Sequence, residues 1–151
     1  MTLQNKEKTD AFYEGFRHQT TIQLRFKDVD SMGHVNNANH LTYFETARMY
    51  YFNEVITKEN NWQKTGFILA SVTINYILPV YLQNEISVFT RCSRIGNKSF
   101  DLEYALVKKT ADGYTLLAKG KSVIVCYDYV LKKSIPVNPE WIEKIKAHDD
   151  F

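Results

Sequence analysis

Residues 25–48 read RFKDVDSMGHVNNANHLTYFETAR and predict, in order, the end of a strand, a tight turn and the start of a long helix. The turn follows from Gly33 and the paired asparagines, which are typical of chain reversals. Beyond it, apolar side chains recur at helical spacing, so we predict a helix from Asn37 to about Val55. Its apolar residues cover almost every face, which is typical of a buried helix. Asn36 or Asn37 can accept hydrogen bonds from the free N–H groups at the helix start.

Two carboxylates, Asp28 and Asp30, stand just before the turn and close in sequence to the predicted start of the helix. Free N–H groups at a helix N-terminus carry partial positive charge and stabilise a developing oxyanion. A carboxylate that faces such a site across an apolar groove is the minimum equipment for hydrolysing an acyl derivative. A thioester suits this equipment, because a thiolate leaves readily with little help from a general acid. We therefore expect the chemistry of this chain at the junction of strand and helix.

Alternating side chains predict strands on either side of this junction. Upstream, residues 18–28 alternate, which places Phe26 on the buried face. Downstream, a hairpin turn is expected at Asp112-Gly113, and Asn138-Pro139 opens a terminal helix that ends near His148. The simplest arrangement is α+β: a long buried helix against a curved, mostly antiparallel sheet, with a short C-terminal helix. The downstream strands are predicted around Val72–Leu78, Ile86–Cys92, Phe100–Leu106 and Tyr114–Tyr127.

Composition bounds the class of protein. The chain has 151 residues, 44% of them apolar, which suits one domain over residues 1–151 with a polar N-terminal lead over residues 1–17. Its net charge of +2 gives no broad field that would concentrate nucleic acid. The uncharged run from Thr65 to Asn84 holds too many polar residues for a membrane span. The N-terminus has no secretory pattern, and Cys92 and Cys126 are typical of small buried residues in a reducing compartment, so we expect a cytoplasmic protein.

The stretch at 25–48 resembles the signature of the hotdog-fold acyl-CoA thioesterases of the 4-hydroxybenzoyl-CoA thioesterase type. The resemblance extends from about His18 to Ile145 and includes NYILPV at 75–80 and IPVNPEWIEKI at 135–145. It implies a hotdog fold and the hydrolysis of an acyl-CoA to the free acid and coenzyme A, with no metal and no redox cofactor. Subunits in this family join two sheets into one, so the resemblance also implies a homodimer or homotetramer with active sites at the interface.

Carried over residue by residue, the resemblance implies that Asp30 is the catalytic carboxylate, either as a nucleophile or as a general base on water. The family's oxyanion donor is a backbone N–H at the start of the helix, and it falls on Asn37. His34 and Asn36 line the same turn, where they can orient water or the carboxylate.

Two further residues are expected to bind substrate. Lys98 matches a basic position that contacts the coenzyme A nucleotide in relatives. His40 occupies a position where relatives usually have tyrosine, one helical turn beyond Asn36 and Asn37, and we expect it to face the acyl pocket. There it either changes the substrate preference or simply substitutes one ring for another.

Several residues have plainer interpretations. Asp28 is expected to be structural, bonded to backbone in the turn or paired with Arg48. His34 and His40 are six apart across a turn, which matches no common spacing of metal ligands, so no metal site is predicted. His18 is expected in solvent.

Two other functions fit the same residues. The first takes the acyl group from acyl carrier protein instead of coenzyme A and predicts a basic rim around the pocket. The second is a non-catalytic module that binds acyl thioesters, since a fold does not fix a function. The residues leave both open, together with the length and aryl character of the acyl group.

Overall fold

The computed structural model of the protein describes residues 14–151, and the polar lead predicted over 1–17 lies outside them as far as residue 13. The strands pair in the order β1-β3-β4-β5-β2, all antiparallel, and β6 pairs with the end of β5. The elements are β1 (His18–Ile22), α2 (Asn39–Tyr51), β2 (Thr65–Tyr76), β3 (Ile86–Ile95), β4 (Ser99–Thr110), β5 (Gly113–Asp128), β6 (Lys133–Ser134) and α3 (Pro139–Asp149).

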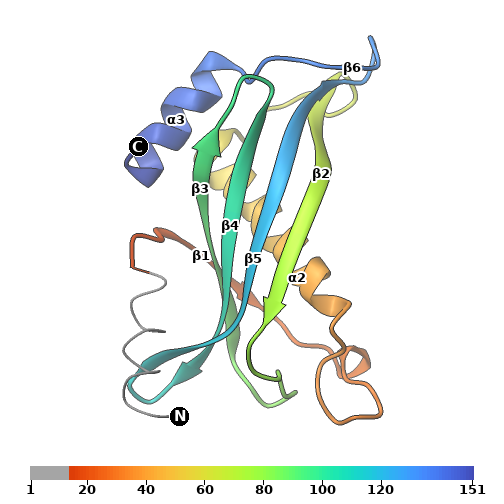
Figure 1. Ribbon diagram of the computed structural model, residues 1–151, viewed down its shortest axis with the longest axis vertical. Helices are drawn as coiled ribbons and strands as arrows, with labels where there is room; N and C mark the ends of the chain where they lie inside the picture. Colours follow the sequence, from red (N-terminus) through yellow and green to blue (C-terminus); the bar gives the residue numbers. More distant parts are fainter. Residues whose placement is uncertain (1–13) are drawn as a thin grey trace.

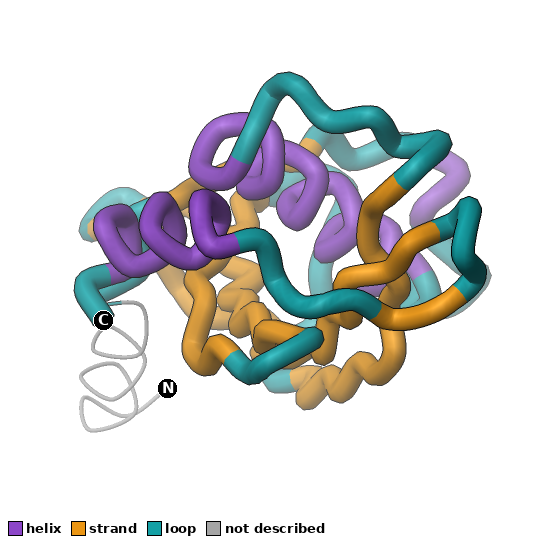
Figure 2. The backbone as a smooth tube through the Cα atoms, turned by 90° about the horizontal axis from the view of Figure 1, so that it is seen from above, coloured by secondary structure: helices purple, strands orange, loops and turns teal. Residues whose placement is uncertain are grey.

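The sheet curls around α2, which runs along its concave face (Figure 1; Figure 2). The core forms where alternate side chains of the central strands meet the helix. Phe44 of α2 stacks on Tyr104 of β4, with ring centroids 4.7 Å apart and an interplanar angle of 10°. Leu102 and Leu106 lie at the alternate positions on either side of Tyr104 and are fully buried. This is the α+β arrangement that the sequence predicts.

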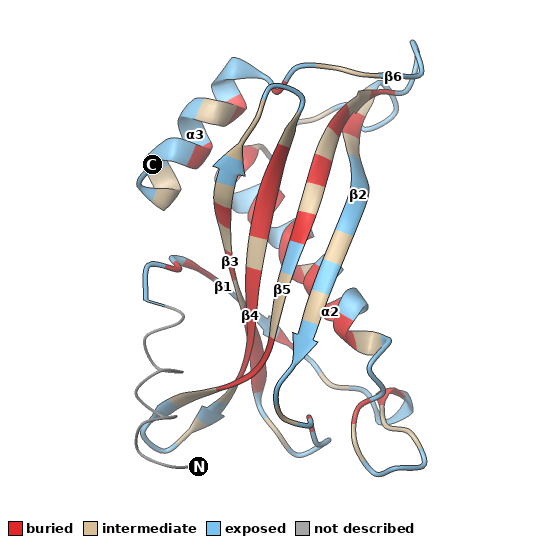
Figure 3. Cartoon of the chain, viewed as in Figure 1, coloured by how far each residue is buried: buried red, intermediate tan, exposed pale blue. Residues whose placement is uncertain are grey.

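β2 forms one edge of the sheet and is exposed along most of its length, whereas β4 in the middle is mostly buried (Figure 3). The sequence of β2, TGFILASVTINY, contains no charged residue and no proline. Ile68, Leu69 and Tyr76 are among its exposed apolar side chains. Proteins usually protect an edge strand with charges, prolines or a covering element, so an uncharged edge of this length is a template for pairing with another strand.

The first strand is shorter than the sequence predicts, and Phe26 does not join the core. β1 ends at Ile22, and a 3-10 turn over Phe26–Asp28 replaces the predicted continuation. The carboxylate of Asp28 accepts hydrogen bonds from the backbone N–H and Nε of Arg25, which folds the chain back on itself. Phe26 is therefore 85% exposed.

The long helix has one exposed side, contrary to the prediction of a helix buried almost all round. α2 covers Asn39–Tyr51 and continues as a π-helical turn over Phe52–Ile56, close to the predicted end. Leu41, Met49 and Tyr50 are exposed apolar side chains of this helix. The sheet covers only one side of α2, so apolar residues on the other side stay at the surface.

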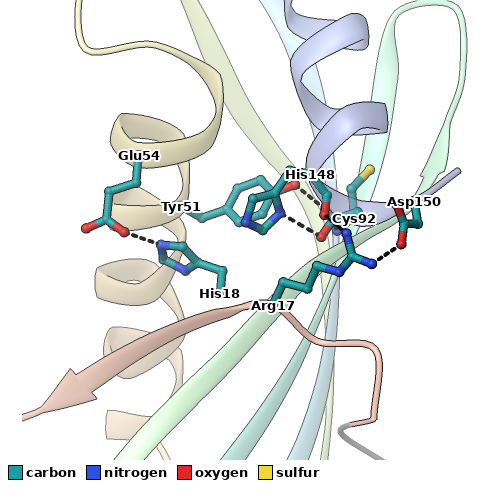
Figure 4. Close-up of polar contacts among 8 residues, drawn as sticks. Arg17, His18, Tyr51, Glu54, Cys92, His148 and Asp150 are labelled. Carbon is teal, nitrogen blue, oxygen red and sulfur yellow. Dashed lines mark hydrogen bonds and ion pairs between the residues drawn. The ribbon is translucent and has the colours of Figure 1, made fainter.

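The C-terminal end of α3 is fastened to the body by a polar cluster (Figure 4). The carboxylate of Asp149 accepts hydrogen bonds from the Tyr51 hydroxyl and from the backbone N–H of Cys92. His18 packs edge-on against Tyr51, and its Nε2 lies 2.6 Å from Glu54. His18 is buried, so the prediction that it lies in solvent is wrong: the rings of Tyr51 in α2 and His148 in α3, both distant in sequence, lie against it.

Gly120 of β5 allows the close approach of α2 to the sheet. A Cβ at this position would lie 2.4 Å from Cε2 of Phe44, whose ring is held by its stack on Tyr104. We expect Gly120→Ala to lower the free energy of unfolding by about 1–3 kcal/mol, because the core must shift to accept the methyl group. Urea unfolding measures this, and the cost should shrink in a Phe44→Leu background. An equal cost in both backgrounds would contradict the explanation.

Candidate active site

The loop before α2 holds Asp30 in a defined position. Both oxygens of its half-buried carboxylate accept a hydrogen bond, Oδ1 from the Met32 N–H at 2.8 Å and Oδ2 from the Asn36 side-chain amide at 3.2 Å. The Asp30 N–H donates to the His34 carbonyl, and Gly33, with φ of +84°, closes the turn by donating to the Asp30 carbonyl. The tight bend predicted at Gly33 is therefore confirmed.

Asn36 connects this carboxylate to the start of α2. Its side-chain oxygen accepts from the N–H of Ala38 at 2.9 Å, while its amide donates to Asp30. The prediction that Asn36 or Asn37 caps the helix is wrong: α2 begins at Asn39 without a side-chain cap, and Asn36 accepts only from Ala38, just before the helix. The next residue, Asn37, has a backbone N–H that donates to no acceptor within residues 14–151. An open N–H thus lies one residue from the amide that holds the carboxylate.

Asp28 is a buried structural carboxylate. It accepts from the Tyr43 hydroxyl at 2.8 Å and forms an ion pair with Arg25 at 2.8 Å. Burial alone raises the pKa of Asp28, but the hydrogen bonds from Tyr43 and Arg25 and the charge of Arg25 outweigh it and hold the pKa below its ordinary value. The structural interpretation is confirmed, although the partner is Arg25 and not Arg48, which donates instead to Tyr104.

A pocket of about 190 Å³ opens beside this loop, lined by His34, Asn37 and His40 on one side and by residues 76–80 on the other. Tyr76, at the end of β2, donates from its hydroxyl to the Asn37 carbonyl at 3.1 Å and so holds the turn that presents the open N–H. The structure therefore brings His34 and His40 together with Asn37, as predicted, and Asp30 lies next to them through Asn36.

His40 is buried in the wall of this pocket. Its ring packs edge-on against Tyr76 with centroids 4.9 Å apart, and its Nδ1 has no partner in the described part of the chain. Burial lowers the pKa of His40, and the nearby backbone of Asn36 and Asn37 opposes this only in part. The imidazole is therefore neutral at neutral pH.

A His40→Tyr variant should lose part of the pH dependence of stability. A histidine whose pKa is lowered by folding binds its proton more readily in the unfolded chain, so the free energy of unfolding falls as the pH falls through about 6.5 toward the folded-state pKa. Urea unfolding between pH 7.5 and 5 measures this slope in both proteins. A slope that His40→Tyr leaves unchanged would show that another group causes it.

Lys98 lies apart from the other predicted site residues. It is exposed in the turn between β3 and β4, where its carbonyl accepts from Cys126, at the opposite end of the sheet from the Asp30 loop (Figure 1). A larger cavity, of about 820 Å³, lies near that end, between α3 and residues 57–60, and contains none of the predicted site residues.

Sequence reasoning missed the residues that hold the site in place. Tyr43 and Arg25 fix Asp28, and Tyr76 fixes Asn37, yet none of the three is among the site residues predicted from the sequence. Spacing offers one signal: Tyr43 is on the buried face of α2, where a hydroxyl needs a partner. Residues 14–151 contain no group of three or more His, Cys, Asp or Glu side chains able to hold a metal ion, and no helix among them is long and apolar enough to cross a membrane.

Comparisons with known proteins show which family and which solved structures the chain is similar to. A family model described as the thioesterase-like superfamily matches residues 24–145. A thioesterase from Thermus thermophilus, solved with coenzyme A and zinc, is 31% identical with a TM-score of 0.77, over 91% of this chain and 98% of that chain.

Two curated relatives are also similar. The long-chain acyl-CoA thioesterase FadM of Escherichia coli (strain K12) is 24% identical over 133 residues, which cover 85% of this chain and 96% of that protein. The uncharacterized protein YsmA of Bacillus subtilis (strain 168) is 31% identical over 83 residues. That match spans just over half of each chain, 55% of this one and 56% of the relative.

Proposed function

Because this chain belongs to the thioesterase-like superfamily and has the hotdog fold, we propose that it hydrolyses an acyl-CoA to the free acid and coenzyme A. The observation that carries the proposal is the pairing of two groups across Asn36. The Asp30 carboxylate accepts from the Asn36 side-chain amide, and the next residue, Asn37, has an open backbone N–H. Together they supply the carboxylate and the oxyanion donor that thioester hydrolysis requires.

In this mechanism Asp30 acts as the general base on water. Donors hold one lone pair of each carboxylate oxygen, which leaves a second lone pair on each to take a proton. The hydroxide equivalent attacks the thioester carbonyl, whose oxygen lies against the Asn37 N–H. Negative charge develops on that oxygen in the transition state, where the donor is already in place because Tyr76 holds the turn. Collapse of the tetrahedral intermediate expels the thiolate of coenzyme A.

The pocket beside the loop receives the acyl carbons next to the thioester. Its volume of about 190 Å³ is slightly more than the roughly 150 Å³ of an apolar cavity that holds benzene. The neutral ring of His40 and the ring of Tyr76 form its wall, so His40 acts as a substrate-binding residue. His34, half-buried at the rim, orients the attacking water.

We further propose a homodimer, or a tetramer built from it, that covers the uncharged edge of β2. Two copies related by a two-fold axis pair their β2 strands antiparallel, which places opposite ends of the two sheets side by side. This arrangement carries Lys98 of one copy toward the Asp30 loop of the other, and so accounts for its distance from the loop within one chain. Lys98 then contacts the phosphates of coenzyme A.

The experiment that tests the function is colorimetric thiol release with short, medium, long and aryl acyl-CoAs, and with the same acyl groups on acyl carrier protein. We expect turnover with coenzyme A esters. Turnover with the carrier protein alone would favour the first alternative, and tight binding without turnover would favour a non-catalytic module. Preference for aryl esters would support the 4-hydroxybenzoyl-CoA type. A cytoplasmic location, which we also propose, agrees with the two buried free cysteines, Cys92 and Cys126.

A further inference from the structure

A third cavity, of about 290 Å³, lies between α2 and the inner face of β2. We call it the Arg48 cavity. Exposed side chains of both elements and of the loop between them surround its mouth, and buried ones lie deeper. Its lining includes Glu45, Arg48, Met49 and Phe52 of the helical segment, Leu69 of β2, and Trp62.

Arg48 is a buried side chain with no counter-ion in the described part of the chain. Only 8% of it is exposed, and no ion pair within residues 14–151 includes it. Its hydrogen bond goes to the hydroxyl of Tyr104 at 3.3 Å, and that hydroxyl also pairs with Ser122 at 2.6 Å. A guanidinium has five N–H donors, so most of its donor capacity is unused. Its other N–H groups have no acceptor within residues 14–151, and the side chain lines the cavity, so a ligand that brings an anion into the cavity can accept from them.

The rest of the lining limits what the anion can be attached to. Phe52, Trp62 and Leu69 present apolar carbon, which favours an aliphatic chain over a sugar or a nucleotide. Glu45 is the other charged residue of the lining, but it is exposed and forms no ion pair with Arg48 in the described chain. A ligand that reaches Arg48 therefore carries its negative charge at the end of an apolar chain.

The Arg48 cavity and the pocket beside Asp30 lie along the same two elements. His40 lines the pocket and Arg48 the cavity, eight residues apart on α2, which corresponds to about 12 Å along the helix axis. β2 contributes Tyr76 to the pocket and Leu69 to the cavity. An apolar cavity of roughly 150 Å³ holds benzene, so the volume of the Arg48 cavity suits about ten to twelve carbons.

We propose that the Arg48 cavity binds an aliphatic chain that ends in a carboxylate, with Arg48 as its counter-ion. Two sources carry this chemistry. One is the distal end of the acyl group of a dicarboxylic acid monothioester bound at Asp30, which rests on the proposed function. The other is a free fatty acid taken up from solution.

Binding of free ligands tests the cavity without reference to catalysis. In isothermal titration calorimetry we expect decanoate to bind more tightly than 1-decanol. Arg48→Met should lower the affinity for decanoate by about 10- to 100-fold, which is the range for losing a hydrogen bond to a charged group. The affinity for 1-decanol should stay unchanged. Arg48→Lys keeps the charge and should restore part of the affinity. Equal binding of the two ligands, or decanoate binding that Arg48→Met leaves unchanged, would overturn the proposal.

A matched pair at the mouth keeps the test valid if Arg48→Met does not fold. Met49 is 42% exposed on α2, and glutamate and glutamine both suit an exposed helical position. Met49→Glu places a carboxylate beside the entrance, whereas Met49→Gln differs only in charge. We expect weaker decanoate binding in Met49→Glu than in Met49→Gln, with no difference for 1-decanol. Equal decanoate affinity in the two variants would count against an anion in the cavity.

Kinetics distinguish the two sources. If the bound acyl chain reaches the cavity, the ratio of kcat/KM for decanedioyl-CoA to that for decanoyl-CoA falls by about tenfold or more in Arg48→Met. An unchanged ratio, with decanoate binding still lost, rejects the acyl group and leaves the free acid as the ligand. If neither ester is hydrolysed by the wild type while decanoate binds through Arg48, the proposed function fails and the cavity stands.

Discussion

Replacing Asp30 with asparagine should lower kcat for acyl-CoA hydrolysis by about 10³- to 10⁴-fold and change KM by less than about threefold, since the general base acts in the transition state and not in substrate binding. Asparagine has nearly the same shape as aspartate, but its amide cannot take the proton of the attacking water. Thiol release under saturating substrate measures the loss.

The control for this variant is Met32→Ala, in the same loop. Met32 is 75% exposed and contributes only its backbone N–H to Asp30, so its side chain should be dispensable. Both variants should keep the melting temperature within a few degrees and the oligomeric state of the wild type. Turnover that survives in Asp30→Asn would mean that another carboxylate is the base.

Replacing Asp28 with alanine should lower the free energy of unfolding by about 2–4 kcal/mol, because it leaves a buried hydroxyl and a partly buried guanidinium without their acceptor. The hydroxyl belongs to Tyr43, which is 3% exposed, and the guanidinium to Arg25, which is about half exposed and regains solvent. Urea unfolding gives the value. In a Tyr43→Phe background the same substitution should cost less, because no hydroxyl is orphaned there.

The wild type and Asp28→Ala should also differ in how much stability they lose in acid. The folded-state pKa of Asp28 lies below that of the unfolded chain, so its stabilising effect is complete above about pH 4 and is lost as the pH falls through the folded-state pKa. The wild type should therefore lose more stability below pH 4 than Asp28→Ala does. Parallel curves for the two proteins would contradict the assigned cause.

Local patterns in the sequence were enough for most of the fold. The hairpin turn predicted at Asp112-Gly113 joins β4 to β5 one residue earlier, at 111–112, and the side chain of Asn138 caps α3 by accepting from Glu140. These features depend on neighbours within a few residues, which the sequence places side by side. The bond from the Ala38 N–H to the side chain of Asn36 is local in the same way, although it precedes α2 and does not cap it.

Contacts between distant segments were not predictable in this way. Phe26 lies outside the core because Asp28 binds back to Arg25, and His18 is buried because Tyr51 of α2 and His148 of α3 lie against its ring. Arg48 shows the same limit: the sequence offered Asp28 as a partner, but a tertiary contact with Tyr104 took its place. The motif at 25–48 was enough to locate the Asp30 loop, and the family resemblance supplied the expected roles of its residues. The side chains that hold this loop, such as Tyr43 and Tyr76, lie in α2 and β2 and were not predictable.

The uncharged edge of β2 has a consequence for how the protein is made. Each newly synthesised chain displays a template of 12 residues that accepts a strand from any molecule that reaches it first. Correct assembly then competes with aggregation in the crowded cell, and the outcome depends on the rate of synthesis and on temperature. Slow expression in the cold should therefore increase the yield of soluble enzyme, and a lysine introduced on this strand should reduce inclusion bodies even where it reduces activity.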